Sequence, residues 1–277
     1  MSESDWGDWL PRAIEAADPD GVAVWYLGCN GFACKGSDGT TIFVDPYVGL
    51  GDPPRTIRMI PVPFDPEDVD AADAVLATHE HTDHVHGPSQ APILANTGAT
   101  FHAPADSLAV AREDEHWPGA YEVDATQFDE VAVGETFDVG EFTVHVEAAH
   151  DPDATQPVSY VFEHDAGTFF HGGDTKPSDE FARIGREYDI DLGVLAFGTV
   201  GNVPDKETRE PKRTRWYNDE NQVIEAANDL QFDRLLPSHW DMWKGLTGDP
   251  TVLHSHANSF AYPEALEVVE IGDRVDL

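Results

Sequence analysis

The stretch "ADAVLATHEHTDH", residues 72–84, runs from an apolar segment into three histidines and an aspartate within six positions. The apolar segment is typical of a buried β-strand. Where such a strand ends in a loop, His79 and His81 alternate onto one side, and the following turn can aim Asp83 and His84 at a neighbouring point. Neutral imidazoles and carboxylates are the usual ligands of Zn²⁺ and also suit Mn²⁺ or Fe. With 13 histidines in 277 residues, this cluster is improbable by chance and predicts a metal site.

The loop offers more ligands than one metal needs. A single metal with an open coordination position uses three protein ligands, so four candidates in one loop indicate a second metal with further ligands from elsewhere. Later apolar runs end in suitable residues: His150 after "VHVEAA", Asp174 in "HGGDT" and His239 in "LLPSHWDMW". Functional loops of α/β folds gather at strand ends, so we expect these side chains to lie near residues 79–84.

The rest of the chain reads as an α/β domain. Runs rich in β-branched and aromatic residues predict strands at 22–27, 41–46, 74–78, 142–147, 159–163, 168–172, 192–197 and 234–237. Amphipathic patterns predict helices at 5–17, 178–188 and 218–230, the last with Asn218 as its N-cap. No linker or repeat divides the chain, so we expect one domain, residues 1–277, with residues 1–21 as an N-terminal helical extension and a mixed sheet following.

Acidic residues dominate the charge balance. The chain has 53 acidic against 16 basic residues and a formal net charge of -37, and the acids are spread along its whole length. Such a spread predicts a solvated acidic surface adapted to high salt, which repels nucleic acid and anionic membranes. The two cysteines, Cys29 and Cys34, form no C-x-x-C motif, and no apolar signal segment occurs. We therefore expect buried thiols and a cytoplasmic location, while the oligomeric state, including a homo-oligomer, stays open.

The order of these motifs resembles the metallo-β-lactamase superfamily. An aspartate follows an early strand (Asp45 in "FVDP"), and then come the loop 79–84, a lone histidine, a "GGDT"-type aspartate and a late histidine. The resemblance implies a four-layer αββα sandwich with two divalent metal ions, Zn²⁺ or Mn²⁺, at one edge between two sheets. It implies that the first metal is held by His79, His81 and His150, and the second by Asp83, His84 and His239, with Asp174 bridging them. Asp45 would hydrogen-bond the ligands from behind.

Three further segments, "WGDWL" (5–9), "WYLGCNGF" (25–32) and "HWDMW" (239–243), are similar to the branch that contains L-ascorbate-6-phosphate lactonase. Residues 201–217 do not match that enzyme, and His150 stands where it lacks a histidine. The resemblance implies a hydrolase in which a metal-bridging hydroxide attacks a lactone or cyclic ester, which can be a phosphorylated sugar lactone, with Asp83 and Asp174 as catalytic residues. No Ser or Cys nucleophile is needed. The alternatives are a phosphodiesterase of the same superfamily and a non-catalytic metal-binding regulatory or scaffold protein.

One short segment departs from the acidic composition. Residues 206–215, "KETREPKRTR", hold five of the 16 basic residues: Lys206, Arg209, Lys212, Arg213 and Arg215. Guanidinium groups suit phosphate, so this segment predicts an anion site for a small-molecule substrate, with Arg209, Lys212, Arg213 and Arg215 as contacts. The alternative is a loop that neutralises nearby acidic surface or contacts another subunit. Lys176, directly after "GGDT", is a further candidate for contact with substrate.

Overall fold

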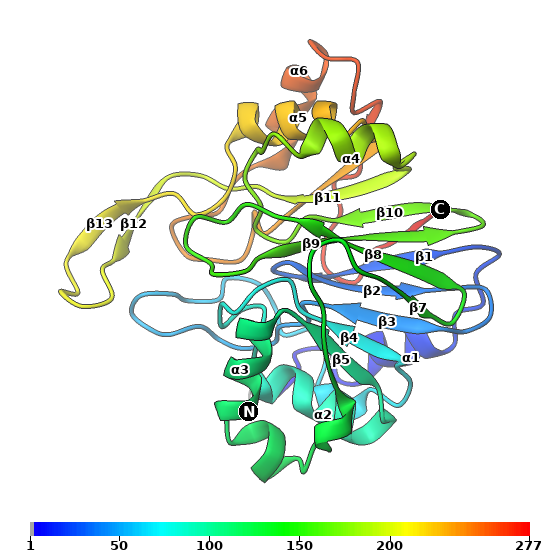
Figure 1. The fold of residues 1–277 in the computed structure, drawn as a ribbon. Coiled ribbons are helices and arrows are strands. Elements are labelled where there is room, and N and C mark those ends of the chain that lie inside the picture. Colours follow the sequence, from blue (N-terminus) through cyan, green and yellow to red (C-terminus); the bar gives the residue numbers. More distant parts are fainter. Residues whose placement is uncertain (1–2) are drawn as a thin grey trace.

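Two seven-stranded sheets lie face to face with helices on their outer sides (Figure 1). The computed structural model describes residues 3–277. The first sheet has the order β16 (Arg274–Asp276), β1 (Ala23–Gly28), β2 (Gly31–Lys35), β3 (Thr41–Val44), β4 (Ala74–Leu76), β5 (Thr100–Ala103) and β6 (Phe128–Glu130). The second has the order β15 (Ala265–Leu266), β14 (Arg234–Ser238), β11 (Leu192–Ala196), β10 (Gly167–His171), β9 (Val158–His164), β8 (Phe142–Ala148) and β7 (Thr136–Val139).

Helices cover the outer face of each sheet. Helices α1 (Trp9–Glu15), α2 (Gly87–Thr97) and α3 (Ala105–Glu113) lie with the first sheet, and α4 (Phe181–Glu187), α5 (Glu220–Asp229) and α6 (Leu253–Ala257) lie with the second (Figure 1). Three apolar layers result: one between α1–α3 and the first sheet, one between the sheets, and one between the second sheet and α4–α6. The expected four-layer αββα sandwich is confirmed.

Both sheets are mixed, as the sequence predicts. Strands β3 to β6 run parallel, and β1, β2 and β16 pair antiparallel at the other side. In the second sheet β10, β11, β14 and β15 are parallel, whereas β7, β8 and β9 are antiparallel. Parallel strands place their carboxyl ends at one edge, so the loops after β3, β4, β10 and β14 meet there.

Every predicted strand is present within two residues of its expected ends, and so is the helix at 218–230, as α5. The helix predicted at 178–188 is present as α4, which begins three residues later than expected, at Phe181. The predicted helix 5–17 is shorter, at Trp9–Glu15. Helices α2 and α3 were not predicted, since proline and alanine dilute their amphipathic pattern. The expected N-cap Asn218 is wrong: Asp219 caps α5 by accepting hydrogen bonds from the backbone N–H groups of Asn221 and Gln222.

Beside the two sheets, β12 (Gly201–Pro204) and β13 (Pro211–Thr214) form a separate antiparallel hairpin. It projects from the body of the molecule on the same side as the loop that follows β3 (Figure 1). The hairpin carries the basic segment 206–215. Within residues 3–277 no helix is long and apolar enough to cross a bilayer.

Candidate metal centre

Asp45, which follows β3 and is completely buried, holds the loop 78–84 in place. The Asp45 carboxylate accepts hydrogen bonds from the Thr78 backbone N–H at 2.9 Å and from the Thr78 hydroxyl at 2.7 Å. It also accepts one from His84 Nδ1 at 2.7 Å. One carboxylate thereby holds both ends of the loop, and it fixes the His84 tautomer so that Nε2 faces away from it.

Three side chains converge at the open side of the loop. His79 Nε2 lies 2.9 Å from His81 Nδ1, and the Asp151 carboxylate lies 3.6 Å and 3.5 Å from these two nitrogens. Ligand atoms around a tetrahedral Zn²⁺ with bonds near 2.0–2.1 Å are separated by roughly 3.3 Å. The spacing of His79, His81 and Asp151 therefore fits a divalent metal ion.

His150 does not join this group. Its side chain is exposed, and its backbone N–H donates to Thr175 Oγ1 while its carbonyl accepts from Lys176 N. The side chain of the next residue, Asp151, occupies the place expected for it. Sequence reasoning missed Asp151 because histidine is the stronger metal-ligand signal. The available hint was that Asp151 directly follows His150 and so shares its position after the same predicted strand.

Asp174 lies between two histidines. It comes after β10, and its carboxylate oxygens lie 3.5 Å from His84 Nε2 and 3.6 Å from His239 Nε2. His84 Nε2 is completely buried yet makes no hydrogen bond to any described residue. A buried imidazole nitrogen without a partner costs free energy, and a cation between His84 and Asp174 would remove that cost. His79, His84 and Asp174 also lie close enough together to hold one ion.

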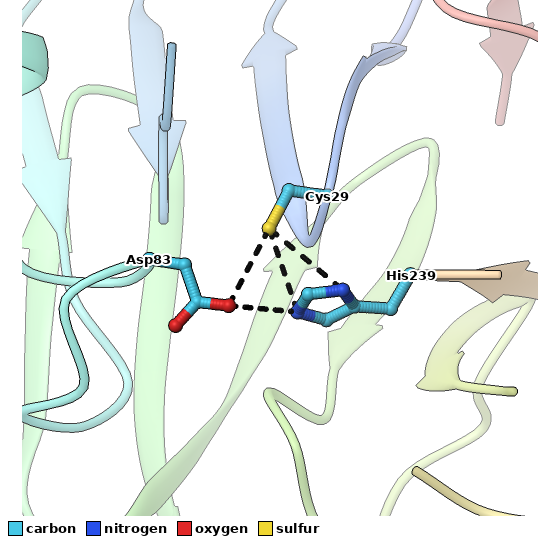
Figure 2. Close-up of side chains that lie close together, drawn as sticks. All are labelled: Cys29, Asp83 and His239. Carbon is cyan, nitrogen blue, oxygen red and sulfur yellow. Dashed lines mark hydrogen bonds and ion pairs between the residues drawn. The ribbon is translucent and has the colours of Figure 1, made fainter. Parts of the chain in front are cut away.

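A third group contains a cysteine that the sequence analysis placed outside the chemistry. Figure 2 shows Cys29, from the turn between β1 and β2, facing Asp83 and His239. His239 Nε2 lies 3.4 Å from Cys29 Sγ and 3.5 Å from Asp83 Oδ2. The expectation that both cysteines are buried thiols is confirmed. The signal for Cys29 was its position directly after a buried strand, which the other candidate ligands share.

Burial and charge act against each other in this centre. Burial lowers the pKa of His79 well below its ordinary value and also lowers the pKa of His239, which favours the neutral form of an imidazole that binds a cation. Burial opposes ionisation of Asp174 too, but His239 and His84 outweigh it and hold the Asp174 pKa well below its usual range. Burial, Asp83 and Asp174 together raise the pKa of the Cys29 thiol. Burial opposes protonation of His84, but Asp45 and Asp174 outweigh it and raise the His84 pKa well above its ordinary value, so a proton on His84 offsets part of the carboxylate charge where an ion could otherwise bind.

A cleft of about 900 Å³ opens over the candidate metal centre. One side is lined by His81, Asp83, Asp151 and Asp174, and the other by the β12–β13 hairpin with Lys206, Lys212, Arg213 and Arg215. Arg55 also lines the cleft, and its guanidinium lies 5.2 Å from the ring centroid of Trp216. One wall of the cleft therefore carries candidate metal ligands, and the other, the basic wall, carries positively charged side chains.

The structure divides the predicted substrate residues. Lys212, Arg213 and Arg215 line the cleft, whereas Arg209 and Lys176 do not. Arg215 pairs with Asp219, and Lys212 approaches Asp205 at 3.9 Å. In the described part of the chain Arg213 makes no ion pair, so its charge is available to a ligand. Lys176 instead donates to the Trp216 carbonyl and so fixes the base of the hairpin.

A known protein family matches the part of the chain that contains most of this site. The model of the family described as "Beta-lactamase superfamily domain" matches residues 40–240, which contain Asp45, the loop 78–84, Asp151, Asp174 and His239. Relatives named "Probable L-ascorbate-6-phosphate lactonase UlaG" from Salmonella gallinarum and Escherichia fergusonii are each 26% identical to the chain. The alignments cover 89% of the chain and 77% of each relative.

Solved structures share the fold. The metallo hydrolase Igni18 from Ignicoccus hospitalis superposes with a TM-score of 0.66 at 20% identity, over 92% of this chain and 97% of its own. The isothiocyanate hydrolase from Delia radicum gut bacteria superposes with a TM-score of 0.67 at 16% identity, over 92% and 98% of the two chains. At these identities the likeness concerns the fold alone.

Proposed function

The chain belongs to the metallo-β-lactamase superfamily, and from that membership we propose that it is a dinuclear metal-dependent hydrolase of lactones or other cyclic esters. The preferred substrate in this proposal is a small cyclic ester that carries a phosphate or another anion. The lactonase relatives support the ester class, and the basic wall of the cleft supports the anion.

The observation that carries the metal-dependent part is the buried His84 Nε2, which makes no hydrogen bond to any described residue. This nitrogen is buried and aimed at Asp174, while its other ring nitrogen is held by Asp45. Such an arrangement is typical of a metal ligand whose tautomer is fixed from behind. We propose His79, His81 and Asp151 as ligands of one ion, and Asp83, His84 and His239 as ligands of the other. Asp174 would bridge them, since its two oxygens face different histidines.

Two divalent cations bound here would supply an activated water near neutral pH and stabilise the negative charge that develops on the attacked group. The chain's own residues would orient the reactants. Asp83 lines the cleft, and only its Oδ2 faces Cys29 and His239, so its other oxygen is free to accept a proton from water in the cleft. Asp174 would keep the two ions at a fixed separation.

The cleft supports a small-molecule substrate. Its volume of about 900 Å³ lies within the usual range for small-molecule sites. Arg213 has no acidic partner in the described part of the chain, so a phosphate or carboxylate on the substrate would gain a charge-assisted hydrogen bond there. The acidic surface elsewhere disfavours long nucleic acid, which is why we prefer a cyclic ester to a nuclease-type phosphodiester.

The test is a substrate panel on protein of known metal content. The chain is stripped with a chelator, reloaded with Zn²⁺ or Mn²⁺ and assayed on simple lactones, phosphorylated sugar lactones and p-nitrophenyl phosphodiesters. We expect about two ions per chain, with turnover of lactones that chelator removes and metal restores. The matched pair of phosphorylated and unphosphorylated lactone tests the basic wall separately.

Three results would contradict the proposal, each in a different way. Failure to bind any divalent ion after reloading would remove the metal-dependent part. Faster turnover of phosphodiesters than of every lactone would replace the substrate class with that of a phosphodiesterase. Two bound ions with no hydrolysis of any substrate would favour a non-catalytic metal-binding protein.

A further inference from the structure

We propose that Cys29 is a metal ligand, and that its sulfur joins Asp83 and His239 in holding the second divalent ion (Figure 2). This assignment rests on the proposed function, because it needs an ion at that position. Its consequence is metal selectivity: a position with a sulfur ligand would prefer Zn²⁺, Co²⁺ or Cd²⁺ to Mn²⁺, since thiolates bind the softer ions more strongly.

The three donor atoms have the separations of ligands around one ion. Cys29 Sγ lies 3.4 Å from His239 Nε2 and 3.8 Å from Asp83 Oδ2, and the nitrogen and oxygen lie 3.5 Å apart. With metal–sulfur bonds near 2.3 Å and metal–nitrogen bonds near 2.0–2.1 Å, neighbouring tetrahedral ligands are separated by roughly 3.5 Å. The donors therefore already enclose a position that an ion could occupy.

His239 supplies the independent observation. Its side chain is completely buried, and the only hydrogen-bonding contact of its ring nitrogens within residues 3–277 is with the Cys29 sulfur. The Asp83 and Asp174 oxygens approach Nε2 to 3.5 Å and 3.6 Å without forming a hydrogen bond. A buried imidazole with so weak a partner is under-satisfied, and an ion shared with Cys29 and Asp83 would satisfy it.

Cys29 and His239 are also fixed to each other through the backbone. The His239 N–H donates to the Cys29 carbonyl at 2.8 Å, and the Tyr26 hydroxyl donates to the same carbonyl at 3.1 Å. Both residues have positive φ angles, 59° for Cys29 and 65° for His239. Non-glycine residues in this region are strained and cluster at functional sites. The fold thus holds the two side chains in position before any ion binds.

Cys34 shows what a purely structural cysteine looks like in this protein. It lies on β2 and packs in the apolar layer between the sheets, where no described polar side chain contacts its sulfur. Both cysteines are completely buried and belong to the same pair of strands, β1 and β2 with their turn, so burial does not distinguish them. Only Cys29 faces an imidazole and a carboxylate. On metal binding its S–H bond breaks, the proton passes to solvent, and the sulfur electron pair forms the bond to the ion.

The test compares Cys29→Ala with Cys34→Ala. Each protein is stripped, reloaded with two equivalents of Co²⁺ and checked for metal content, and its near-ultraviolet absorption is recorded. We expect a sulfur-to-cobalt charge-transfer band in the wild-type protein and in Cys34→Ala, and its loss in Cys29→Ala. Competition between Zn²⁺ and Mn²⁺ gives a second readout: Cys29→Ala should reduce the preference for Zn²⁺ by roughly tenfold or more, and Cys34→Ala should leave it unchanged.

X-ray absorption of the zinc-loaded wild-type protein needs no variant and covers the case in which Cys29→Ala does not fold. Sulfur scattering at about 2.3 Å, retained in Cys34→Ala, would support the assignment. Two bound ions with nitrogen and oxygen neighbours alone would overturn it and leave the proposed function standing. A protein that binds no divalent ion would overturn both.

Discussion

At the scale of single residues, Asp45 decides the geometry of the candidate metal centre without facing the cleft. It joins the Thr78 end of the loop to the His84 end and leaves His84 Nε2 free. Its own φ angle is 46°, so the backbone is strained at the place that organises the loop. A residue that hydrogen-bonds a metal ligand often contributes strongly to metal affinity, although it does not contact the ion itself.

We expect Asp45→Asn to weaken metal binding by about 10- to 100-fold, because an amide cannot accept all three hydrogen bonds that the carboxylate accepts. Titration with Zn²⁺ against a competing chelator measures this. Asp73→Asn is the matched control. Asp73 directly precedes β4, at the end of that strand remote from the metal centre, and accepts a hydrogen bond from the Thr41 backbone N–H. Equal affinities for Asp45→Asn and wild type would show that Asp45 only supports the fold.

Neighbouring residues give a second contrast. We expect Asp151→Ala to lose most of one metal equivalent and at least about 100-fold in kcat/KM, because its carboxylate lies within 3.6 Å of His79 and His81. His150→Ala should stay within a few-fold of wild type, since that side chain is exposed. Elemental analysis and lactone kinetics on both variants provide the measurement. The reverse ranking would restore the ligand set inferred from the sequence.

At the scale of secondary-structure elements, the β12–β13 hairpin forms the basic side of the cleft, and the start of α5 follows it along the chain. The two are linked through Arg215, which pairs with the N-cap Asp219 of α5. Asn218, immediately before the cap, donates to the Thr175 and Ala196 carbonyls and so ties this junction to the loop after β10 and to the end of β11. These contacts therefore fix the positions of the hairpin, the start of α5 and the candidate metal centre relative to one another.

The hairpin prediction concerns substrate charge. Arg213→Ala should lower kcat/KM for a phosphorylated lactone by about 10- to 150-fold, the equivalent of one charge-assisted hydrogen bond of roughly 1.5–3 kcal/mol. The unphosphorylated analogue should be nearly unaffected. Arg209→Ala is the control, because Arg209 belongs to the same hairpin but does not line the cleft. Equal losses on both substrates would identify the hairpin as a structural or subunit-contact element.

Asp219 both caps α5 and pairs with Arg215, and two substitutions can separate these roles. Asp219→Ala removes the side chain that caps α5 and should cost about 1 kcal/mol of unfolding free energy. Asp219→Asn keeps a good N-cap and loses only the ion pair with the half-exposed Arg215, so its cost should be smaller. Denaturant unfolding of the two variants gives both values. If the two variants lose the same stability, the ion pair and not the cap holds this helix start.

At the scale of the whole molecule, the net charge of -37 acts on stability. Folding brings these charges together, and their mutual repulsion opposes the compact state. The 16 basic residues can offset only part of the charge of the 53 acidic residues, and five of the 16 lie in the single segment 206–215. Salt is then the main source of screening.

We expect the melting temperature to rise steeply between 0.1 M and 2 M KCl. The Debye length falls from about 10 Å at 0.1 M to about 3 Å at 1 M, which screens repulsion between surface carboxylates. Differential scanning calorimetry at constant pH and metal content measures the effect. An unchanged melting temperature over this range would rule out the adaptation to high salt.

The sequence alone determined the α/β class, the order of the motifs along the chain and most of the candidate ligands, and its resemblance to the metallo-β-lactamase superfamily implied the sandwich fold. It could do so because buried strands leave continuous apolar runs, and because histidines and aspartates at their ends stand out against such runs. His79, His81, Asp83, His84, Asp174 and His239 are brought together as predicted from this pattern. The apolar runs also explain why each predicted strand lies within two residues of its expected ends.

Only the tertiary structure decided which neighbour of a pair faces the centre and which distant residues join it. His150 and Asp151 are adjacent, and the turn of the backbone after β8 alone sends one side chain outward and the other inward. Cys29 and His239 are 210 positions apart, and the contact between them exists because the β1–β2 turn and the end of β14 meet across the two sheets. Local sequence carries periodicity and residue type, whereas contacts between distant loops depend on how the sheets pack.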